Sequence, residues 1–336
     1  MITFGWMLSA LLFVGCNKDK EAGDDTGDTS GTVECTVRVS ETVPAQDESF
    51  YYRGTIEVYF TEADDTATVT LLDSAGGEVS GTSSWDDTGT VLSFEPSSPL
   101  APSSNYTLNI SYCYGAPSVT FSTSELGAEA EVDELAGKAY TIDLASATFV
   151  EPAGIGGLIG DLLEQNILVG VVSADSSSLS MIGAISVTGT TEQDTCTPSI
   201  DFPEADFSEN PFFSVGPEDT TIAVAGYSAT IRGLEISGAF APDLSYFGGG
   251  KLAGTIDSRD LLTIPDLLDL TGCDGTDDAC LCDFIGGTGL ATCSACSDGE
   301  DLCLKLLAKD IVAEEISGSL VVRTDADVAG DPECAE

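Results

Sequence analysis

Cysteine constrains the fold of this chain more than any other residue type. The sequence of 336 residues contains eleven cysteines, and six of them fall within residues 273–303. Cysteines at this density either crosslink a small excursion of the chain through disulfides or bind a metal ion as thiolates. The choice depends on whether the chain enters an oxidising compartment, so the N-terminus decides how the cysteines are interpreted.

The N-terminus has the pattern of an exported chain. Residues 1–15 are a short apolar run, below the roughly 20 residues that span a bilayer as a helix and typical of a signal peptide. Leu12-Phe13-Val14-Gly15-Cys16 resembles the lipobox of bacterial lipoproteins. That resemblance implies cleavage before Cys16 and a diacylglycerol thioether on its sulfur. Because Asn17 follows, it also implies sorting to the outer membrane, with the membrane as a partner through the lipid.

An ordinary signal peptide followed by a chance cysteine is the alternative. The segment before the apolar run has no Lys or Arg, and this departs from the usual signal-peptide pattern. Residues 16–34 continue as a tether rich in Gly, Asp and Thr. Such a flexible segment has an end-to-end distance of roughly 23 Å.

Composition excludes several classes of function. There are 57 acidic against 11 basic residues, which gives a formal net charge of −46. A chain this acidic repels nucleic acid, so we expect no nucleic-acid partner. The sequence has no histidine, which removes Ser-His-Asp and Cys-His nucleophiles and every zinc site that contains His.

Residues 35–124 read as short alternating strands with turns between them, at 55–60, 67–72, 90–94, 106–110 and 118–121. The segments Val58-Tyr59-Phe60-Thr61-Glu62-Ala63, Leu92-Ser93-Phe94-Glu95-Pro96 and Tyr106-Thr107-Leu108 resemble the bacterial Ig-like domain family of surface-layer and exported proteins. The resemblance covers about 90 residues and implies a β-sandwich that acts as a spacer or adhesive module. Tyr106 is either a tyrosine corner or a half-exposed strand residue. Cys35 and Cys113 flank this sandwich and are expected to pair.

An acidic linker is expected at 125–136, followed by a second β-rich domain at 137–336. Strand patterns recur at 140–144, 167–172, 179–187, 221–225, 229–236, 250–256 and 319–323, and helical patterns at 155–165, 261–270 and 302–312. The fold class is therefore mainly all-β: the Ig-like sandwich, then an antiparallel barrel or sandwich with a small cysteine-rich helical insertion at 273–303.

Ten cysteines remain after Cys16, and an exported chain is expected to form five disulfides from them. Cys196 and Cys334 pair by exclusion. The pairing among Cys273, Cys280, Cys282, Cys293, Cys296 and Cys303 stays open. A thiolate metal site is the alternative, because the Cys293-x-x-Cys296 spacing suits zinc, but a second pair at that spacing is missing. We expect no resident metal or cofactor.

Two further segments are candidates for binding. Residues 154–160 are apolar and rich in glycine, either a lip that meets an acyl chain or a tight turn before a buried helix. Residues 201–213 alternate aromatic and acidic residues, and either rim a cleft or cap an open barrel end. No catalytic serine, lysine or zinc-protease motif is present.

These observations favour a lipid-anchored envelope protein without catalytic residues. The second domain is expected to be a binding or structural module, adhesin-like or scaffold-like, with a protein or glycan ligand. A carrier of an apolar ligand is the alternative, and a hydrolase that uses two carboxylates is a third hypothesis. An enclosed apolar cavity would favour the carrier, whereas a filled core with an exposed aromatic patch would favour the adhesin-like module. A cleft with two facing carboxylates would favour the hydrolase.

Overall fold

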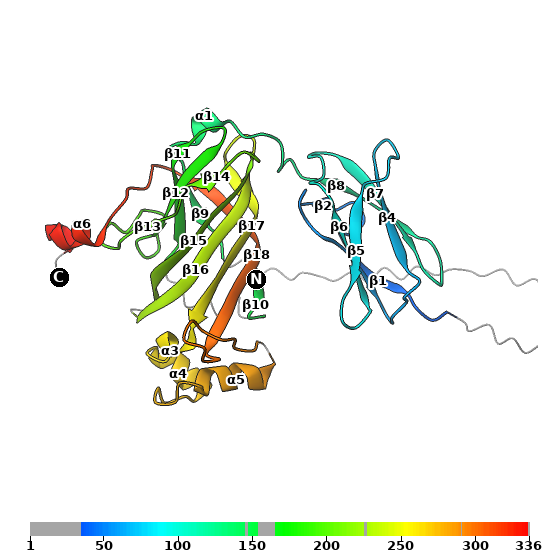
Figure 1. The fold of residues 1–336 in the computed structure, drawn as a ribbon. Coiled ribbons are helices and arrows are strands. Elements are labelled where there is room, and N and C mark those ends of the chain that lie inside the picture. Colours follow the sequence, from blue (N-terminus) through cyan, green and yellow to red (C-terminus); the bar gives the residue numbers. More distant parts are fainter. Residues whose placement is uncertain (1–34, 145–146, 154–164, 225–226, 290, 335–336) are drawn as a thin grey trace, which may run out of the picture. The chain divides into compact units, whose positions relative to one another are not determined.

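The computed structural model describes residues 35–144, 147–153, 165–224, 227–289 and 291–334. The predicted signal peptide, Cys16 and the tether lie outside these residues. The described chain is mostly β-structure (Figure 1), as predicted from the sequence. Among the described residues, no helix combines the length and the apolar character needed to cross a membrane.

The first part is a sandwich of two sheets. One sheet has the order β1-β3-β6-β5, and the other has the order β2-β8-β7-β4. The strand bounds are β1 Val39–Val43, β2 Ser49–Phe50, β3 Ile56–Phe60, β4 Thr68–Asp73, β5 Gly81–Trp85, β6 Val91–Pro96, β7 Asn105–Ser111 and β8 Ser118–Thr123. The five strands expected here from the sequence are all present.

Alternating side chains explain why these segments form strands. In β3, Ile56, Val58 and Phe60 are buried between the sheets, while the residues between them are partly exposed. In β7, Tyr106 and Leu108 are buried in the same alternating manner. Period-two burial places every apolar side chain of a strand on one face, so each sheet contributes one wall of the core.

The second part is a ten-stranded antiparallel sheet that closes almost completely into a barrel. The order is β13-β12-β11-β9-β18-β17-β16-β15, with β10 paired to β18 and β14 paired to β12. The bounds are β9 Ala139–Ile142, β10 Thr148–Glu151, β11 Ile167–Ala174, β12 Ser178–Ile185, β13 Ile200–Asp201, β14 Ala205–Asp206, β15 Phe212–Val224, β16 Tyr227–Phe240, β17 Tyr246–Asp257 and β18 Cys303–Ile316.

Aromatic side chains fill the interior of this barrel. Tyr140, Phe207, Phe213, Phe240 and Phe247 are fully buried and belong to one core cluster. Phe213 and Phe240 stack with ring centroids 4.6 Å apart, and the edge of Phe247 meets Phe213 at 5.2 Å. Full burial of each ring stabilises the fold by about 1.5–3 kcal/mol. The described interior is therefore a packed core.

Half of the predicted 125–136 linker contributes to this core. Residues Val132–Leu135 form the short helix α1. Leu135 and Ala130 are buried in the barrel cluster, and the Asn210 side chain binds the backbone N–H and C=O of Ala130 at 3.1 and 3.0 Å. The acidic composition of this stretch favoured a linker, although its apolar residues pack into the barrel core.

The helix predicted at 302–312 is wrong, because these residues lie in strand β18. This strand pairs with β17 on one side and with β9 and β10 on the other. Asp310 adopts φ 57 within the strand, next to a register shift opposite Gly250. Such a bulge breaks the period of two, so the apolar spacing resembled that of a helix. The backbone hydrogen bonds of β18 are made to neighbouring strands that only the tertiary fold brings together.

The strand predicted at 319–323 is also absent. These residues run as an irregular segment to α6 Asp325–Gly330 and the 3-10 turn η1 Pro332–Cys334. The segment is attached to the barrel by side chains, because Gln193 exchanges two hydrogen bonds of 2.8 Å with the backbone of Val321. Arg323 is held in the same way by Ser199, whose hydroxyl accepts from its N–H at 2.9 Å.

Candidate functional site

The cysteine-rich insertion forms a cap on the barrel domain. It comprises residues 258–302, between the end of β17 and the start of β18, and contains α3 Ser258–Leu261, α4 Pro265–Thr271 and α5 Cys280–Thr288. The predicted helix at 261–270 is thus divided in two, because Pro265 begins a new helix. Figure 1 shows the three helices together beyond one end of the barrel strands.

Three disulfides crosslink the cap and settle the pairing that the sequence left open. The pairs are Cys273–Cys280, Cys282–Cys293 and Cys296–Cys303. The first and third bridges each span seven positions, and the second spans eleven. Closing a loop of this size contributes about 2.5 kcal/mol in the chain-entropy account. The cap needs these crosslinks, because among the described residues its own core cluster has three buried members, Leu262, Cys273 and Leu281.

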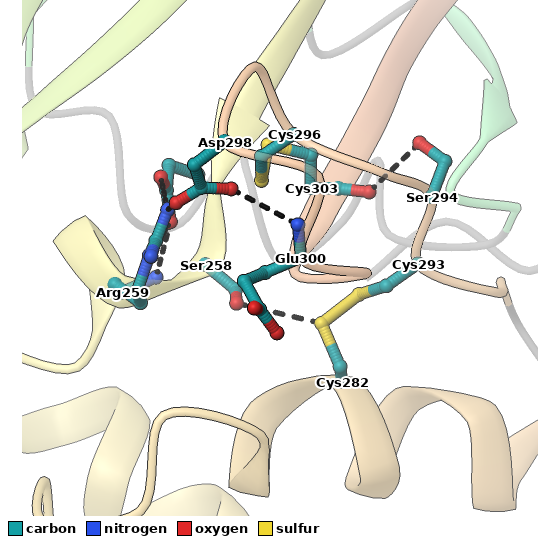
Figure 2. The surroundings of a disulfide bond; sticks show 10 residues. Ser258, Arg259, Cys282, Cys293, Ser294, Cys296, Asp298, Glu300 and Cys303 are labelled. Atoms are coloured by element: carbon teal, nitrogen blue, oxygen red, sulfur yellow. Dashed lines mark hydrogen bonds and ion pairs between the residues drawn. A yellow bond between two sulfur atoms is a disulfide. The ribbon is translucent and has the colours of Figure 1, made fainter.

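Arg259 clamps the cap to the last residue of β17. Its Nε donates to Asp257 Oδ1 at 2.8 Å, and its Nη2 donates to Asp257 Oδ2 at 2.6 Å. The same Nη2 reaches Asp298 Oδ2 at 2.7 Å, in the loop that carries Cys296 (Figure 2). A planar guanidinium suits this arrangement, since its fork matches a carboxylate on two atoms while another donor bond remains free.

These ion pairs favour the charged form of both carboxylates. The Arg259 guanidinium lowers the pKa of buried Asp257 below its ordinary value of 3.8. For Asp298, the backbone N–H of Glu300 is the first cause of the lowered pKa and Arg259 is the second. The two acids in turn raise the pKa of Arg259. The cluster therefore stays fully ionised at neutral pH.

Further polar contacts fix the cap from other directions. The buried Ser258 hydroxyl lies 3.4 Å from Cys282 Sγ, on α5 (Figure 2). Asp260 accepts a bond from the backbone N–H of Thr230 on β16 at 3.3 Å. The Ser258 N–H donates to Leu302 O at 2.9 Å, which closes the base of the insertion. The cap is thus fastened to two barrel strands and to itself.

Asp257 also belongs to a group of three residues that could hold a metal ion. Its carboxylate and the sulfur atoms of Cys296 and Cys303 all lie within 4.8 Å of one another. The two sulfurs are bonded together in this structure. Sequence reasoning missed Asp257 and Arg259, although an Asp directly after a strand and before a helical turn is a recognisable N-cap, and Asp257 does accept from the Arg259 N–H at 3.1 Å.

The other predicted residues lie apart from the cap. Cys196 and Cys334 are bonded, which is the pair that the cysteine count leaves by exclusion, and this bridge fastens the C-terminus. Cys35 and Cys113 are each disulfide-bonded. Cys16 and the apolar residues 154–160 are outside the described residues. Within residues 201–213, Phe202, Phe207 and Phe213 are buried in the barrel core, and Phe213 lies in strand β15.

Tyr106 forms the tyrosine corner in the sandwich. Its side chain is buried, and its hydroxyl accepts the backbone N–H of Ala101 at 2.9 Å. Tyr106 lies five residues after Ala101 in the sequence, so this bond fixes the turn that precedes β7. The half-exposed alternative is wrong for this residue.

Comparisons with known proteins support the first domain only. The family model described as a bacterial Ig-like domain matches residues 34–113. No curated protein matches this chain.

Solved structures give only distant similarity. CopC from Methylosinus trichosporium OB3b has 15% identity and a TM-score of 0.24, over 26% of this chain and 93% of CopC. The surface layer protein SbsC, domains 1–6, has 10% identity and a TM-score of 0.24, over 67% of this chain and 33% of that one. A DUF4784 family protein from Bacteroides caccae has 10% identity and a TM-score of 0.20, over 59% of this chain and 48% of that protein's chain.

Proposed function

We propose that this protein is a lipid-anchored module of the bacterial envelope that works by binding and not by catalysis. In this proposal Cys16 holds the mature chain to the outer membrane, and the Ig-like domain serves as a spacer. The barrel domain then presents its outer surface and its cap to a protein or glycan. The anchor is supported by the short apolar run that ends at Cys16, and export is supported by the disulfides of the cap.

The packed barrel interior is the observation that carries the proposal. Five aromatic rings touch one another where a carrier barrel would keep its ligand cavity. Tyr140 adds a buried hydrogen bond from its hydroxyl to Leu244 O at 3.1 Å. Full burial of one ring stabilises the fold by about 1.5–3 kcal/mol. An acyl chain in the interior would displace several such rings, so the cost would be several times this amount. The outer surface is the better place for a ligand.

Mass spectrometry of the mature protein tests the anchor. The full sequence is expressed in a Gram-negative host, and membrane protein is measured intact without reductant. We expect a chain that begins at Cys16, carries diacylglycerol and has no free thiol. The Cys16→Ser variant should lose the lipid and leave the membrane fraction. Membrane retention of that variant, or an unmodified Cys16 in the wild type, would refute the anchor.

Native mass spectrometry separates a surface module from a carrier. The mass of the purified chain is measured before and after organic extraction. Binding of the same chain is then measured on a glycan array and to isolated envelope proteins. We expect no stoichiometric apolar ligand, and saturable binding to one glycan or protein. An apolar molecule bound at one per chain would replace this proposal with the carrier.

A further inference from the structure

At the base of the cap, two sulfur atoms and one carboxylate from three positions in the sequence lie close together. Asp257 and Cys303 are buried and Cys296 is half-buried, with their ligand atoms within 4.8 Å of one another. Two thiolates and a carboxylate are a donor set that zinc accepts, with a fourth position left for water. We propose that Asp257, Cys296 and Cys303 form a redox-gated site for a zinc-class divalent ion, closed by the disulfide and opened by a dithiol reductant.

Backbone hydrogen bonds would keep the two thiols in place after reduction. Ser294 and Cys303 exchange two such bonds, of 2.8 and 2.9 Å, across a short antiparallel bridge. Cys296 N–H donates to Glu300 O at 2.8 Å, and Gly299 N–H donates to Cys296 O at 3.0 Å. Figure 2 shows this loop folded back against the start of β18. The two cysteines therefore face each other for reasons that do not depend on the sulfur–sulfur bond.

The geometry suits a tetrahedral ion. Zinc–sulfur bonds of about 2.3 Å place two thiolates about 3.8 Å apart on a tetrahedron. The Cα atoms of Cys296 and Cys303 are 5.1 Å apart, so rotation of the side chains supplies that separation. The Asp257 carboxylate, at the end of β17 and at the N-cap of α3, already lies within 4.8 Å of both sulfur atoms.

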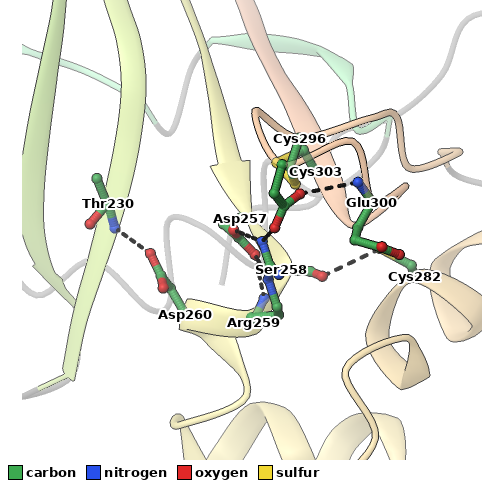
Figure 3. Close-up of polar contacts among 10 residues, drawn as sticks. Thr230, Asp257, Ser258, Arg259, Asp260, Cys282, Cys296, Glu300 and Cys303 are labelled. Atoms are coloured by element: carbon green, nitrogen blue, oxygen red, sulfur yellow. Dashed lines mark hydrogen bonds and ion pairs between the residues drawn. A yellow bond between two sulfur atoms is a disulfide. The ribbon is translucent and has the colours of Figure 1, made fainter.

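Arg259 acts as the outer partner of the site. It holds both oxygens of Asp257 (Figure 3) and also binds Asp298 (Figure 2). Metal-bound carboxylates are commonly oriented in this way by a second hydrogen-bonding group. A divalent ion and one guanidinium would offset three of the four negative charges that two thiolates and two carboxylates carry.

Opening the site is an ordinary thiol–disulfide exchange. One thiolate of the dithiol attacks a sulfur of the Cys296–Cys303 bridge and forms a mixed disulfide, and its second thiol then displaces the protein thiolate. The bridge gains two electrons, and the reductant leaves as a disulfide. Binding of the ion releases the protons of both cysteine thiols, because thiolates are the ligands.

Cobalt(II) reports this site through thiolate-to-metal absorption. The full mature chain is reduced without oxygen by a phosphine and titrated with Co²⁺. We expect one equivalent to bind with thiolate absorption, and none in the oxidised chain. The Cys296→Ser/Cys303→Ser variant should lose that absorption, and Asp257→Asn should weaken binding at least tenfold. The matched control, Cys273→Ser/Cys280→Ser, removes a bridge of the same separation and should bind like the wild type.

Two results would overturn the proposal. One is a reduced wild type without thiolate–cobalt absorption, and the other is an equal signal in the Cys296→Ser/Cys303→Ser variant. If reduction loosens the cap, amide exchange of residues 258–302 replaces absorption as the measurement. Zn²⁺ should then restore protection at least tenfold in the wild type but not in that variant, and unchanged protection in both would count against the site.

Discussion

Arg259 shows how much a single side chain can hold at the residue scale. It is the only basic residue between Asp257 and Leu302 in the sequence, and its partner Asp257 is only 7% exposed. A buried carboxylate that loses its partner costs about 1–3 kcal/mol. We expect Arg259→Ala to lower the free energy of unfolding by this amount and to speed amide exchange in α5. Denaturant unfolding and hydrogen exchange measure the two effects.

A surface ion pair provides the matched control. Lys138 and Glu315 form a bond of 2.6 Å, but both side chains are more exposed than Asp257. Exposed pairs contribute about 0–1 kcal/mol. Lys138→Ala should therefore change stability less than Arg259→Ala and leave exchange in α5 unaltered. Equal effects of the two substitutions would contradict the clamp.

Asp257 predicts a pH dependence of the same clamp. Its pKa in the folded protein lies below the ordinary value of 3.8, since Arg259 stabilises the carboxylate. The contribution to stability is complete above pH 3.8 and is lost as pH falls through the lowered pKa. The stability difference between wild type and Asp257→Asn should be largest near neutral pH and shrink below pH 3.8. Urea unfolding at several pH values measures it, and a difference that grows with acid would refute the mechanism.

The C-terminal segment illustrates the element scale, where a crosslink decides whether an element is ordered. Fixing a residue costs about 1–2 kcal/mol, whereas each hydrogen bond returns about 0.5–1.5 kcal/mol. Residues 319–334 make only a few bonds to the barrel, such as that of Arg323 Nε to Thr195 O at 2.8 Å. The Cys196–Cys334 bridge joins positions 138 apart in the sequence and adds about 5 kcal/mol to these bonds in the chain-entropy account.

Removing this bridge should release the segment. In Cys196→Ser/Cys334→Ser, we expect residues 319–334 to exchange their amide hydrogens at least tenfold faster, while β16 and β17 stay protected. Hydrogen-exchange mass spectrometry resolves the two regions. Cys273→Ser/Cys280→Ser, which opens a bridge elsewhere, should leave the segment protected. Retained protection after loss of the Cys196–Cys334 bridge would show that the polar contacts suffice.

At the scale of the whole molecule, each of the two β-domains has its own hydrophobic core. Phe240 is fully buried and contacts four other aromatic rings of the barrel. Truncating such a residue costs about 3–5 kcal/mol. Phe240→Ala should lower the melting temperature seen by far-UV circular dichroism, which is sensitive to the barrel strands.

Trp85 gives a separate probe of the sandwich. It is the single tryptophan after residue 16, and it packs against Phe60 at 5.6 Å. The fluorescence melt of Trp85 should shift less than the dichroism melt in Phe240→Ala. Phe94→Ala, in the sandwich core, should reverse this order. Equal shifts of both probes in both variants would mean that the domains unfold as one unit.

The sequence by itself determined the β class, the strands of the sandwich and the need for crosslinks. Period-two alternation is a local property, so β3 and β7 could be predicted from their own residues. The expected number of disulfides also needs no structure, because it follows from the ten cysteines after Cys16 and the expected oxidising compartment. Tyr106 could be proposed as a tyrosine corner from its place at the start of a strand, although its burial and its bond to Ala101 could not be predicted.

Only the tertiary structure decided the features that depend on distant neighbours. Strand β18 resembled a helix because the bulge at Asp310 breaks its alternation, and its hydrogen bonds come from β9, β10 and β17. The pairing of the six clustered cysteines required the path of the cap. The convergence of Asp257 with Cys296 and Cys303 required it too, because separations of 39 and 46 residues carry no periodic signal. Local patterns follow from the chain itself, whereas contacts between remote segments depend on how the barrel closes.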